Sequence, residues 1–283
     1  MDQLARMLAD KLRAPPFANI IVENRSGAGG RIAAEAFKGM PADGSALLFT
    51  PASPMVIYPH IYRKLGYRPL EDMVPMTSLH VTKLGLIVGP GAPVKTLTEY
   101  LAWLKRAPQN AVYGSPGACT MSHFLGSMFA RATGVALTHV PYRGGAPMSQ
   151  DLLGGQVPAA FQPIGFDSVE RHRGGKLTVL AVAEPKRSQQ LPDVPTFAEL
   201  GFEGLVVNEW FGLFAPAGTS AATVQAISQR ARTAMQQPDI VTWLERGQAD
   251  ALTSTPEELG ARLRSDLQRW GQIVEDSGFQ AEE

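Results

Sequence analysis

Residues 113–123 hold the side chains of this sequence best suited to binding or to chemistry. The apolar residues before this stretch fit a short buried strand, and those after it recur at the spacing of one helical face. Between them lie two glycines and the hydroxyls of Ser115, Thr120 and Ser122. Such a loop presents backbone N–H groups at the positive end of a helix dipole, which favours an anion such as a carboxylate. An ordinary strand-to-helix turn has a similar composition, because helices need N-caps and tight turns need glycine.

Cys119 lies in the same stretch and offers a second chemistry. A thiol at a helix start has a lowered pKa and could act as a nucleophile with His123 or His139 as its base, which would make the protein a Cys119-dependent hydrolase. The sequence contains neither a Gly-x-Ser-x-Gly elbow nor a Cys-x-x-Cys pair, and a lone cysteine beside Pro116 and Ala118 is more typical of a small buried residue. We therefore predict no catalytic residue and a protein that is not an enzyme.

Two arginines could hold a carboxylate through a bidentate fork. Arg143 lies in the turn-rich stretch 141–147 next to Tyr142, and we predict that both contribute to the site. Arg25 is expected to be a solvated surface residue. Trp210 fits a core aromatic and a ligand wall equally well.

The composition excludes several classes of function. At 283 residues the chain can form one or two domains with a sizeable core. Lys plus Arg and Asp plus Glu number 26 each, so nothing indicates a nucleic-acid partner. The single cysteine excludes an intrachain disulfide, and the five histidines form no His-Glu-x-x-His pattern, so we predict no metal and no cofactor. No apolar run approaches the ~20 residues of a membrane span.

Helices alternate with short apolar strands, which predicts an α/β protein with a mostly parallel sheet that binds ligands at the carboxyl ends of its strands. The expected strands are residues 20–22, 46–49, 73–79, 84–88, 111–113, 137–140, 157–161 and 176–183. Capping boxes begin at Thr96, Thr196 and Thr255, and the last of them opens a helix that runs to about Ser277.

Two stretches rich in glycine and proline, residues 89–93 and 215–219, are predicted to be crossings between two lobes. Residues 1–90 and 215–283 would then form lobe 1, residues 91–214 would form lobe 2, and the two crossings would act as a hinge.

Two loops of the first lobe have compositions that suit ligand contacts. Residues 26–30 are glycine-rich and partly match a dinucleotide fingerprint, but Ile32 occupies its third position, so a tight turn is expected. Residues 50–54 form a small, hydroxyl-bearing loop in which Ser53 could contact a ligand.

Ordered blocks over nearly the whole chain resemble the Bug family, the solute-binding receptors of tripartite tricarboxylate transporters. These blocks are VENR at 22–25, GAGG at 27–30, IAAE at 32–35, PADG at 41–44, YGS at 113–115, HVPYRG at 139–144, AP at 146–147, DLLGGQV at 151–157, LPDVPT at 191–196 and WFGLFAPAGT at 210–219, together with Gly117, His123 and Glu199. The resemblance implies an α/β, two-lobed type 2 periplasmic-binding-protein fold. Its lobes would close on a small carboxylate and present it transiently to membrane permease subunits.

The resemblance also implies where the ligand is held. One carboxylate would bind the loop that contains Ser115, Gly117 and Thr120, and the loop around Ser53 would supply facing contacts. Cys119, Tyr142, Arg143 and Asp2 complete the predicted ligand-binding set. The ligand classes expected are a dicarboxylate, an acidic amino acid or an aromatic carboxylate, and a monomer suits such a receptor.

Compared with the family, the sequence begins after the strand and Pro-Gly-Gly loop that usually precede the residue matched by Asp2. The first strand is therefore expected to be missing. The resemblance implies a periplasmic protein, whereas the absence of a signal peptide implies a cytoplasmic one if Met1 is the natural start. A cytoplasmic sensor built on the same fold is accordingly an alternative, beside the hydrolase.

Overall fold

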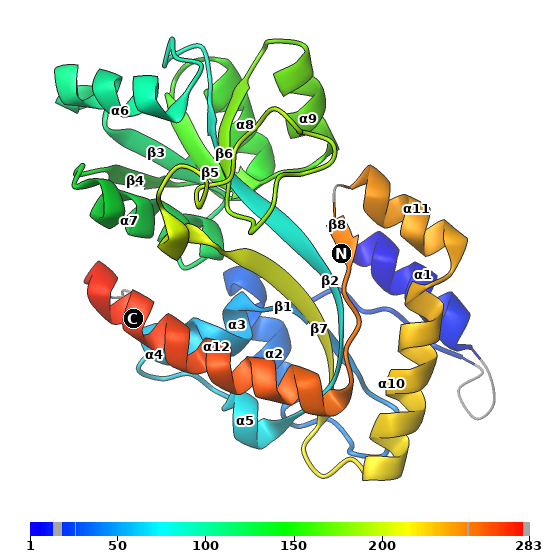
Figure 1. Ribbon diagram of the computed structural model, residues 1–283. Coiled ribbons are helices and arrows are strands. Elements are labelled where there is room, and N and C mark those ends of the chain that lie inside the picture. Colours follow the sequence, from blue (N-terminus) through cyan, green and yellow to red (C-terminus); the bar gives the residue numbers. More distant parts are fainter. Residues whose placement is uncertain (14–18, 26, 248, 280–283) are drawn as a thin grey trace. The chain divides into compact units, whose positions relative to one another are not determined.

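The structure, a computed structural model, describes residues 1–13, 19–25, 27–247 and 249–279 (Figure 1). The chain divides into two compact units, unit 1 (Met1–Val81 and Trp210–Glu283) and unit 2 (Thr82–Glu209). The division falls inside strand β2 (Met73–Val88) and near the start of strand β7 (Asn208–Pro216), not at the glycine- and proline-rich stretches.

Each of these two stretches is a turn that lies inside a single unit. The Gly89 N–H donates to the Pro158 carbonyl inside unit 2, and the Ala217 N–H donates to the Asp72 carbonyl inside unit 1. The chain passes between the units as extended strand, because neither β2 nor β7 is interrupted at the boundary.

Unit 2 alternates helices and strands, as predicted. Its elements after β2 are α6 (Leu97–Arg106), η2 (Pro108–Asn110), β3 (Val112–Ser115), α7 (Met121–Thr133), β4 (Thr138–Pro141), α8 (Gly145–Leu153), β5 (Ala159–Pro163), α9 (Phe166–Arg173), β6 (Thr178–Val182) and η3 (Glu203–Leu205). Strand β3 is parallel to β4 and β5, while β2 pairs antiparallel with β5 and β6. The sheet is therefore mixed, and the prediction of a mostly parallel sheet is wrong because β2 runs opposite to both of its neighbours here.

Apolar residues of the helices bury against this sheet. On α8, Met148 and Leu152 pack with Ile87 of β2 and Ala160 of β5 in one core cluster. Helix α7 contacts β3, β4 and β5, and Phe129 from its inner face lies 5.5 Å, centroid to centroid, from Phe161. This packing fixes the end of β3 and the start of α7, and therefore the loop between them.

Unit 1 contains the remaining elements. They are α1 (Asp2–Leu12), η1 (Ala28–Gly30), α2 (Arg31–Phe37), β1 (Leu48–Pro51), α3 (Ser53–Val56), α4 (Tyr58–Ile61), α5 (Pro69–Asp72), α10 (Ala221–Met235), α11 (Pro238–Arg246), β8 (Ala249–Ala251) and α12 (Pro256–Ser277). Strand β1 is antiparallel to β7, and both β7 and β8 neighbour β2. Helix α1 lies beside α10 (Figure 1), where Leu4 and Leu8 share a core cluster with Val224 and Ile227.

Two strand predictions are corrected by the structure. Residues 20–22 form no strand, because no described strand pairs with them, and Ile21 is 89% exposed. Residues 73–79 and 84–88 belong to the single strand β2, which continues through the half-buried Thr82 and Lys83.

The capping boxes have different outcomes. Thr255 and Glu258 make both reciprocal hydrogen bonds, and α12 runs from Pro256 to Ser277, as predicted. Thr196 and Glu199 make the same pair of bonds, at 2.9 and 3.1 Å, but the residues that follow form turns instead of a helix. The pattern therefore fixes the local hydrogen bonds, and tertiary packing decides whether a helix follows.

Candidate functional site

The loop of residues 115–120, here called the hydroxyl loop, joins β3 to α7 in unit 2. Thr120 caps α7, because its Oγ1 accepts from the His123 N–H at 3.2 Å, and the same hydroxyl donates to the Gly117 carbonyl at 2.9 Å. The Ser115 hydroxyl donates to that carbonyl at 2.8 Å. Ser115 is fully buried and Thr120 is half-buried. Both hydroxyls therefore turn onto one carbonyl and hold the loop closed.

Backbone N–H groups, in contrast, are left available at the start of α7. Within the part of the chain that the structure describes, no acceptor takes a hydrogen bond from the N–H of Ala118, Thr120, Met121 or Ser122. The first N–H groups of a helix have no partner inside it, and in the buried residues Met121 and Ser122 an unpaired N–H costs free energy. These four N–H groups, together with the helix dipole, can bind an anion without a formal positive charge.

Cys119 lies at the centre of the loop in a strained conformation. Its φ angle is 63°, in the left-handed region that residues other than glycine rarely adopt, and it is 5% exposed. Its N–H donates to Nδ1 of His123 at 3.3 Å. Because that ring nitrogen already accepts a hydrogen bond from the backbone, it is poorly placed to take a proton from the thiol. This bond argues against the hypothesis that Cys119 is a nucleophile with His123 as its base.

His123 and His139 form a stacked pair beneath the loop. Their ring centroids are 4.0 Å apart with an interplanar angle of 12°, and Nε2 of His139 lies 2.7 Å from Oγ of Ser115. Burial lowers the pKa of His123 to about 4. Burial, with a smaller contribution from His123, lowers the pKa of His139 to about 3. Both rings are therefore neutral near pH 7.

A second loop, residues 141–144, is bonded to the first. The Tyr142 N–H donates to the Ser115 carbonyl at 3.0 Å, and the Gly144 N–H donates to the Pro116 carbonyl at 2.8 Å. Arg143 lies between these two anchors. It is exposed and makes no ion pair or side-chain hydrogen bond with any described residue. A cation without a partner among the described residues thus lies next to the hydroxyl loop.

Tyr142 is engaged within unit 2. Its hydroxyl donates to Oδ2 of Asp151 at 2.9 Å. Burial and this hydrogen bond raise the pKa of Tyr142 to about 12, so the phenol stays protonated. Its ring also covers Gly114, where an added Cβ would lie 3.0 Å from Cε2 of the ring. The Tyr142 ring therefore packs against β3 at Gly114.

The structure brings six of the eight predicted ligand-binding residues together in unit 2, namely Ser115, Gly117, Cys119, Thr120, Tyr142 and Arg143. The other two belong to unit 1. Ser53 is buried at the start of α3, just after β1. Asp2 is exposed at the start of α1, where it pairs with Arg6 at 3.0 Å and accepts a hydrogen bond from Asn24. A role for any of the eight as a ligand contact stays a prediction.

Arg25, Trp210 and the glycine-rich loop each have partners within unit 1. Arg25 pairs with Glu23 at 2.7 Å. Trp210 is fully buried in unit 1, and its Nε1–H donates to Asp266 at 2.7 Å, which fits a core aromatic. In the glycine-rich loop, of which Ser26 lies outside the described residues, the Tyr58 hydroxyl donates to the Gly29 carbonyl at 3.2 Å. Tyr58 therefore fills the space above Gly29, as a tight packed turn requires.

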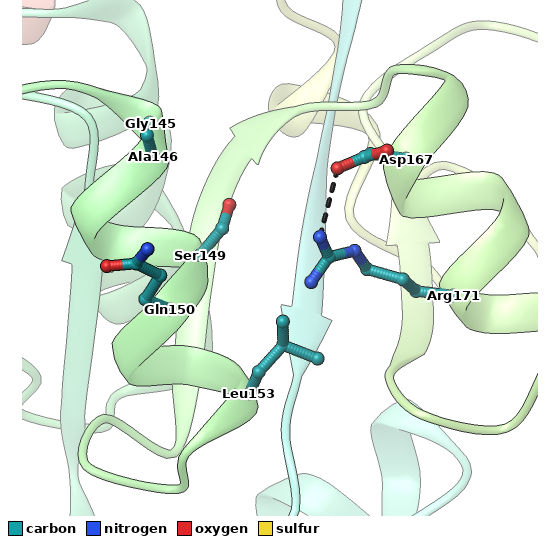
Figure 2. A pocket seen from close by; sticks show the side chains of 7 residues that line it. All are labelled: Gly145, Ala146, Ser149, Gln150, Leu153, Asp167 and Arg171. Atoms are coloured by element: carbon teal, nitrogen blue, oxygen red, sulfur yellow. Dashed lines mark hydrogen bonds and ion pairs between the residues drawn. The ribbon is translucent and has the colours of Figure 1, made fainter.

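A cavity of about 370 Å³ lies between α8 and α9 of unit 2 (Figure 2). It is lined by Gly145, Ala146, Ser149, Gln150, Leu153, Asp167 and Arg171. Figure 2 shows Arg171 directed at Asp167, with which it pairs at 3.0 Å, so its charge is already compensated. None of the predicted site residues lines this cavity.

The described residues lack two further features. They contain no group of three or more His, Cys, Asp or Glu side chains that could hold a metal ion. No helix among them has the length and apolar character needed to cross a membrane.

Comparisons with known proteins give a consistent result. A family model described as "Tripartite tricarboxylate transporter family receptor" matches residues 4–279. The protein BugT of Bordetella pertussis is 32% identical over 279 residues, which are 98% of this chain and 85% of BugT.

Solved structures of similar proteins include two with dicarboxylates bound. A protein of R. palustris with adipate superposes with a TM-score of 0.87 at 27% identity, covering 98% of this chain and 92% of that one. MatC from Rhodopseudomonas palustris with bound malate gives a TM-score of 0.82 at 28% identity, covering 96% of this chain and 94% of that one. The periplasmic binding protein BugD gives a TM-score of 0.85 at 28% identity, covering 99% of this chain and 94% of that one, and with it these likenesses confirm the predicted α/β periplasmic-binding-protein fold.

Proposed function

The chain belongs to the tripartite tricarboxylate transporter family receptors, and from that premise we propose that it is a non-catalytic receptor for a small dicarboxylate. Proteins of this family are solute-binding receptors, and its Bug members are periplasmic binding proteins. We propose the same compartment for this protein, with delivery of the bound acid to a tripartite tricarboxylate-type permease. Acidic amino acids and aromatic carboxylates are the other ligands to be tested.

One observation carries the proposal, namely the set of N–H groups on the hydroxyl loop for which the described residues provide no acceptor. The N–H groups of Ala118, Thr120, Met121 and Ser122 lie at the dipole-positive end of a helix of 13 residues. A carboxylate offers two oxygens with several lone pairs, which suits donors gathered in this way. The adipate and malate bound by the two solved relatives are ligands of that chemistry.

Arg143 supplies the second part of the proposed site. Because the N–H groups of its neighbours Tyr142 and Gly144 are tied to the hydroxyl loop, its backbone is fixed beside the N–H donors. A guanidinium binds a carboxylate in a bidentate, charge-assisted manner. We therefore assign the first carboxylate to the N–H groups and the second carboxylate of a dicarboxylate to Arg143.

The proposal is tested by calorimetry and thermal denaturation with adipate, malate, glutamate and benzoate. Hexane-1,6-diol and hexanoate are the matched controls for adipate, because they lack both carboxylates or one of them. At a hundredfold excess over Kd, a ligand that binds only the folded state stabilises it by about 2.7 kcal/mol, which raises Tm by several degrees. The proposal is wrong if no carboxylate raises Tm and none releases or absorbs heat.

Arg143→Gln separates the two carboxylates. Losing a charge-assisted hydrogen bond costs about 1.5–3 kcal/mol, so the affinity for adipate should fall by about tenfold or more. The affinity for hexanoate should change much less. The matched control is Arg106→Gln on α6, which removes an exposed arginine outside the two loops and should leave both affinities unchanged. Equal losses for adipate and hexanoate would contradict the assignment of Arg143.

A further inference from the structure

The hydrogen bonds around Ser115 fix the direction of its proton. Its Oγ lies 2.8 Å from the Gly117 carbonyl oxygen and 2.7 Å from Nε2 of His139. The carbonyl can only accept, and a hydroxyl carries a single proton. If Nε2 of His139 carried no proton, the serine oxygen would face two acceptors and could donate to only one of them, so the other contact would be repulsive. The serine proton therefore goes to the Gly117 carbonyl, and the His139 ring donates from Nε2. The Ser115 hydroxyl is then fully used inside the loop.

His123 also bonds to the loop, but its ring accepts a hydrogen bond where the ring of His139 donates one. Its Nδ1 lies 3.3 Å from the Cys119 nitrogen. A backbone N–H can only donate a hydrogen bond, so in the neutral ring this nitrogen must accept it. The accepting nitrogen is thus Nδ1, and the ring proton is on Nε2. This bond holds Cys119 at its strained φ of 63°, which sets the direction of the N–H groups on either side of it.

The two imidazoles are themselves held in place by their surroundings. The Tyr113 hydroxyl donates to the His123 carbonyl at 2.9 Å, and the Tyr113 ring lies 4.9 Å, centroid to centroid, from the ring of His139. His139 pairs with Tyr113 across the parallel strands β3 and β4, so its ring rises on the same face as Ser115. One imidazole donates to the loop, the other accepts from it, and their stacking couples the two bonds.

We propose that His123 and His139 are positioning residues, which shape the hydroxyl loop for ligand binding without touching the ligand. Ser115 has the same role, so its hydroxyl acts inside the loop and the bound carboxylate is held by the N–H groups. This inference rests on the proposed function, because it assigns how the same site is kept in its binding conformation.

The test uses pairs of substitutions that remove or keep each hydrogen bond. His139→Gln places an amide nitrogen where Nε2 donates, and His139→Leu removes the donor at similar size. His123→Asn places an oxygen where Nδ1 accepts, and His123→Leu removes the acceptor. Each variant is titrated calorimetrically with adipate at neutral pH. The leucine variants should bind about tenfold more weakly or worse, and the amide variants should stay within about threefold of the natural protein.

A second measurement follows the loop without any ligand. Cys119 is the single cysteine and is 5% exposed, so the rate at which its thiol reacts with 5,5′-dithiobis(2-nitrobenzoate) reports opening of the hydroxyl loop alone. The leucine variants should react several-fold faster than the natural protein, and the amide variants should react at nearly its rate. If the leucine variants do not fold, Ser115→Ala takes their place in both measurements. This substitution removes the hydroxyl that contacts Gly117 and His139, and it keeps both imidazole rings.

The outcomes separate this inference from the proposed function. If the natural protein binds adipate and the leucine variants bind it with unchanged affinity, the positioning role is wrong and the receptor function stands. Equal losses in the leucine and amide variants also overturn it, because hydrogen bonding would then not be the cause. If the natural protein binds no carboxylate, the proposed function fails, and the thiol reaction rates still accept or reject the role of the histidines in shaping the loop.

Discussion

Acidification should destabilise this protein through histidines that are neutral and buried. His80 in unit 1 and His123 in unit 2 are 5% and 6% exposed, and burial lowers the pKa of each to about 4. In the unfolded chain a histidine titrates near pH 6.5. Between these two pKa values the unfolded state binds more protons than the folded state, so the free energy of unfolding falls as the pH falls from about 6.5 towards 4.

The expected loss follows from the two pKa values. For each of these two histidines, a change from about pH 7.5 to about pH 5 lowers the free energy of unfolding by about 2 kcal/mol, so the pair contributes about 4 kcal/mol. Carboxylates whose pKa is lowered in the folded state, such as Glu199 and Asp239, add their own loss only at lower pH, because they stay ionised in both states above about pH 5. The interval from about pH 6.5 to 5 therefore isolates the histidines.

Urea unfolding at a series of pH values across this interval measures the effect. His123→Asn removes one buried titrating group and should reduce the pH-dependent loss by about 2 kcal/mol. His60→Asn is the matched control, because it makes the same replacement at an exposed position. A free energy of unfolding that is constant or rises on going from pH 7.5 to 5 would refute this reasoning.

Two further predictions concern the packing and capping of single helices. Gly126→Ala should lower the free energy of unfolding by about 1–3 kcal/mol, because its Cβ would lie 2.2 Å from Cε2 of Tyr113, whereas Gly145→Ala on α8 meets no atom within 4 Å and should be neutral or slightly stabilising in the same urea titration; equal effects of the two would contradict the clash. Thr255→Ala should cost about 1 kcal/mol, since the Glu258 N–H loses its acceptor, and an unchanged Tm would show that the capping box contributes nothing.

The parts of the fold that depend on local sequence were predicted well. The capping box at Thr255 begins α12, and Gly278 with φ of 65° ends it one residue after Ser277. The hydroxyl loop follows β3 and leads into α7 at Thr120, because small residues and an N-cap are recognisable without knowledge of the rest of the chain. The alternation of helices and strands similarly identified the α/β class.

The parts that depend on pairing between distant segments were not predicted. Residues 20–22 have strand-like residues but no described partner strand, and a strand is stabilised by its neighbours more than by its own composition. From the sequence, His123 and His139 were given a role only as bases for Cys119, beside their place in the blocks that resemble the Bug family. Their stacking depends on the register that pairs Tyr113 with His139 across β3 and β4, which no local pattern specifies.

Backbone N–H groups of the hydroxyl loop are the groups that we propose hold the carboxylate. The most direct test is an amide ¹H–¹⁵N NMR titration of the protein with adipate or malate, whichever binds more tightly. The largest shifts, in the direction of stronger hydrogen bonding, should fall on Ala118, Thr120, Met121 and Ser122. Saturable binding that leaves these four amides unmoved and shifts others instead would contradict it.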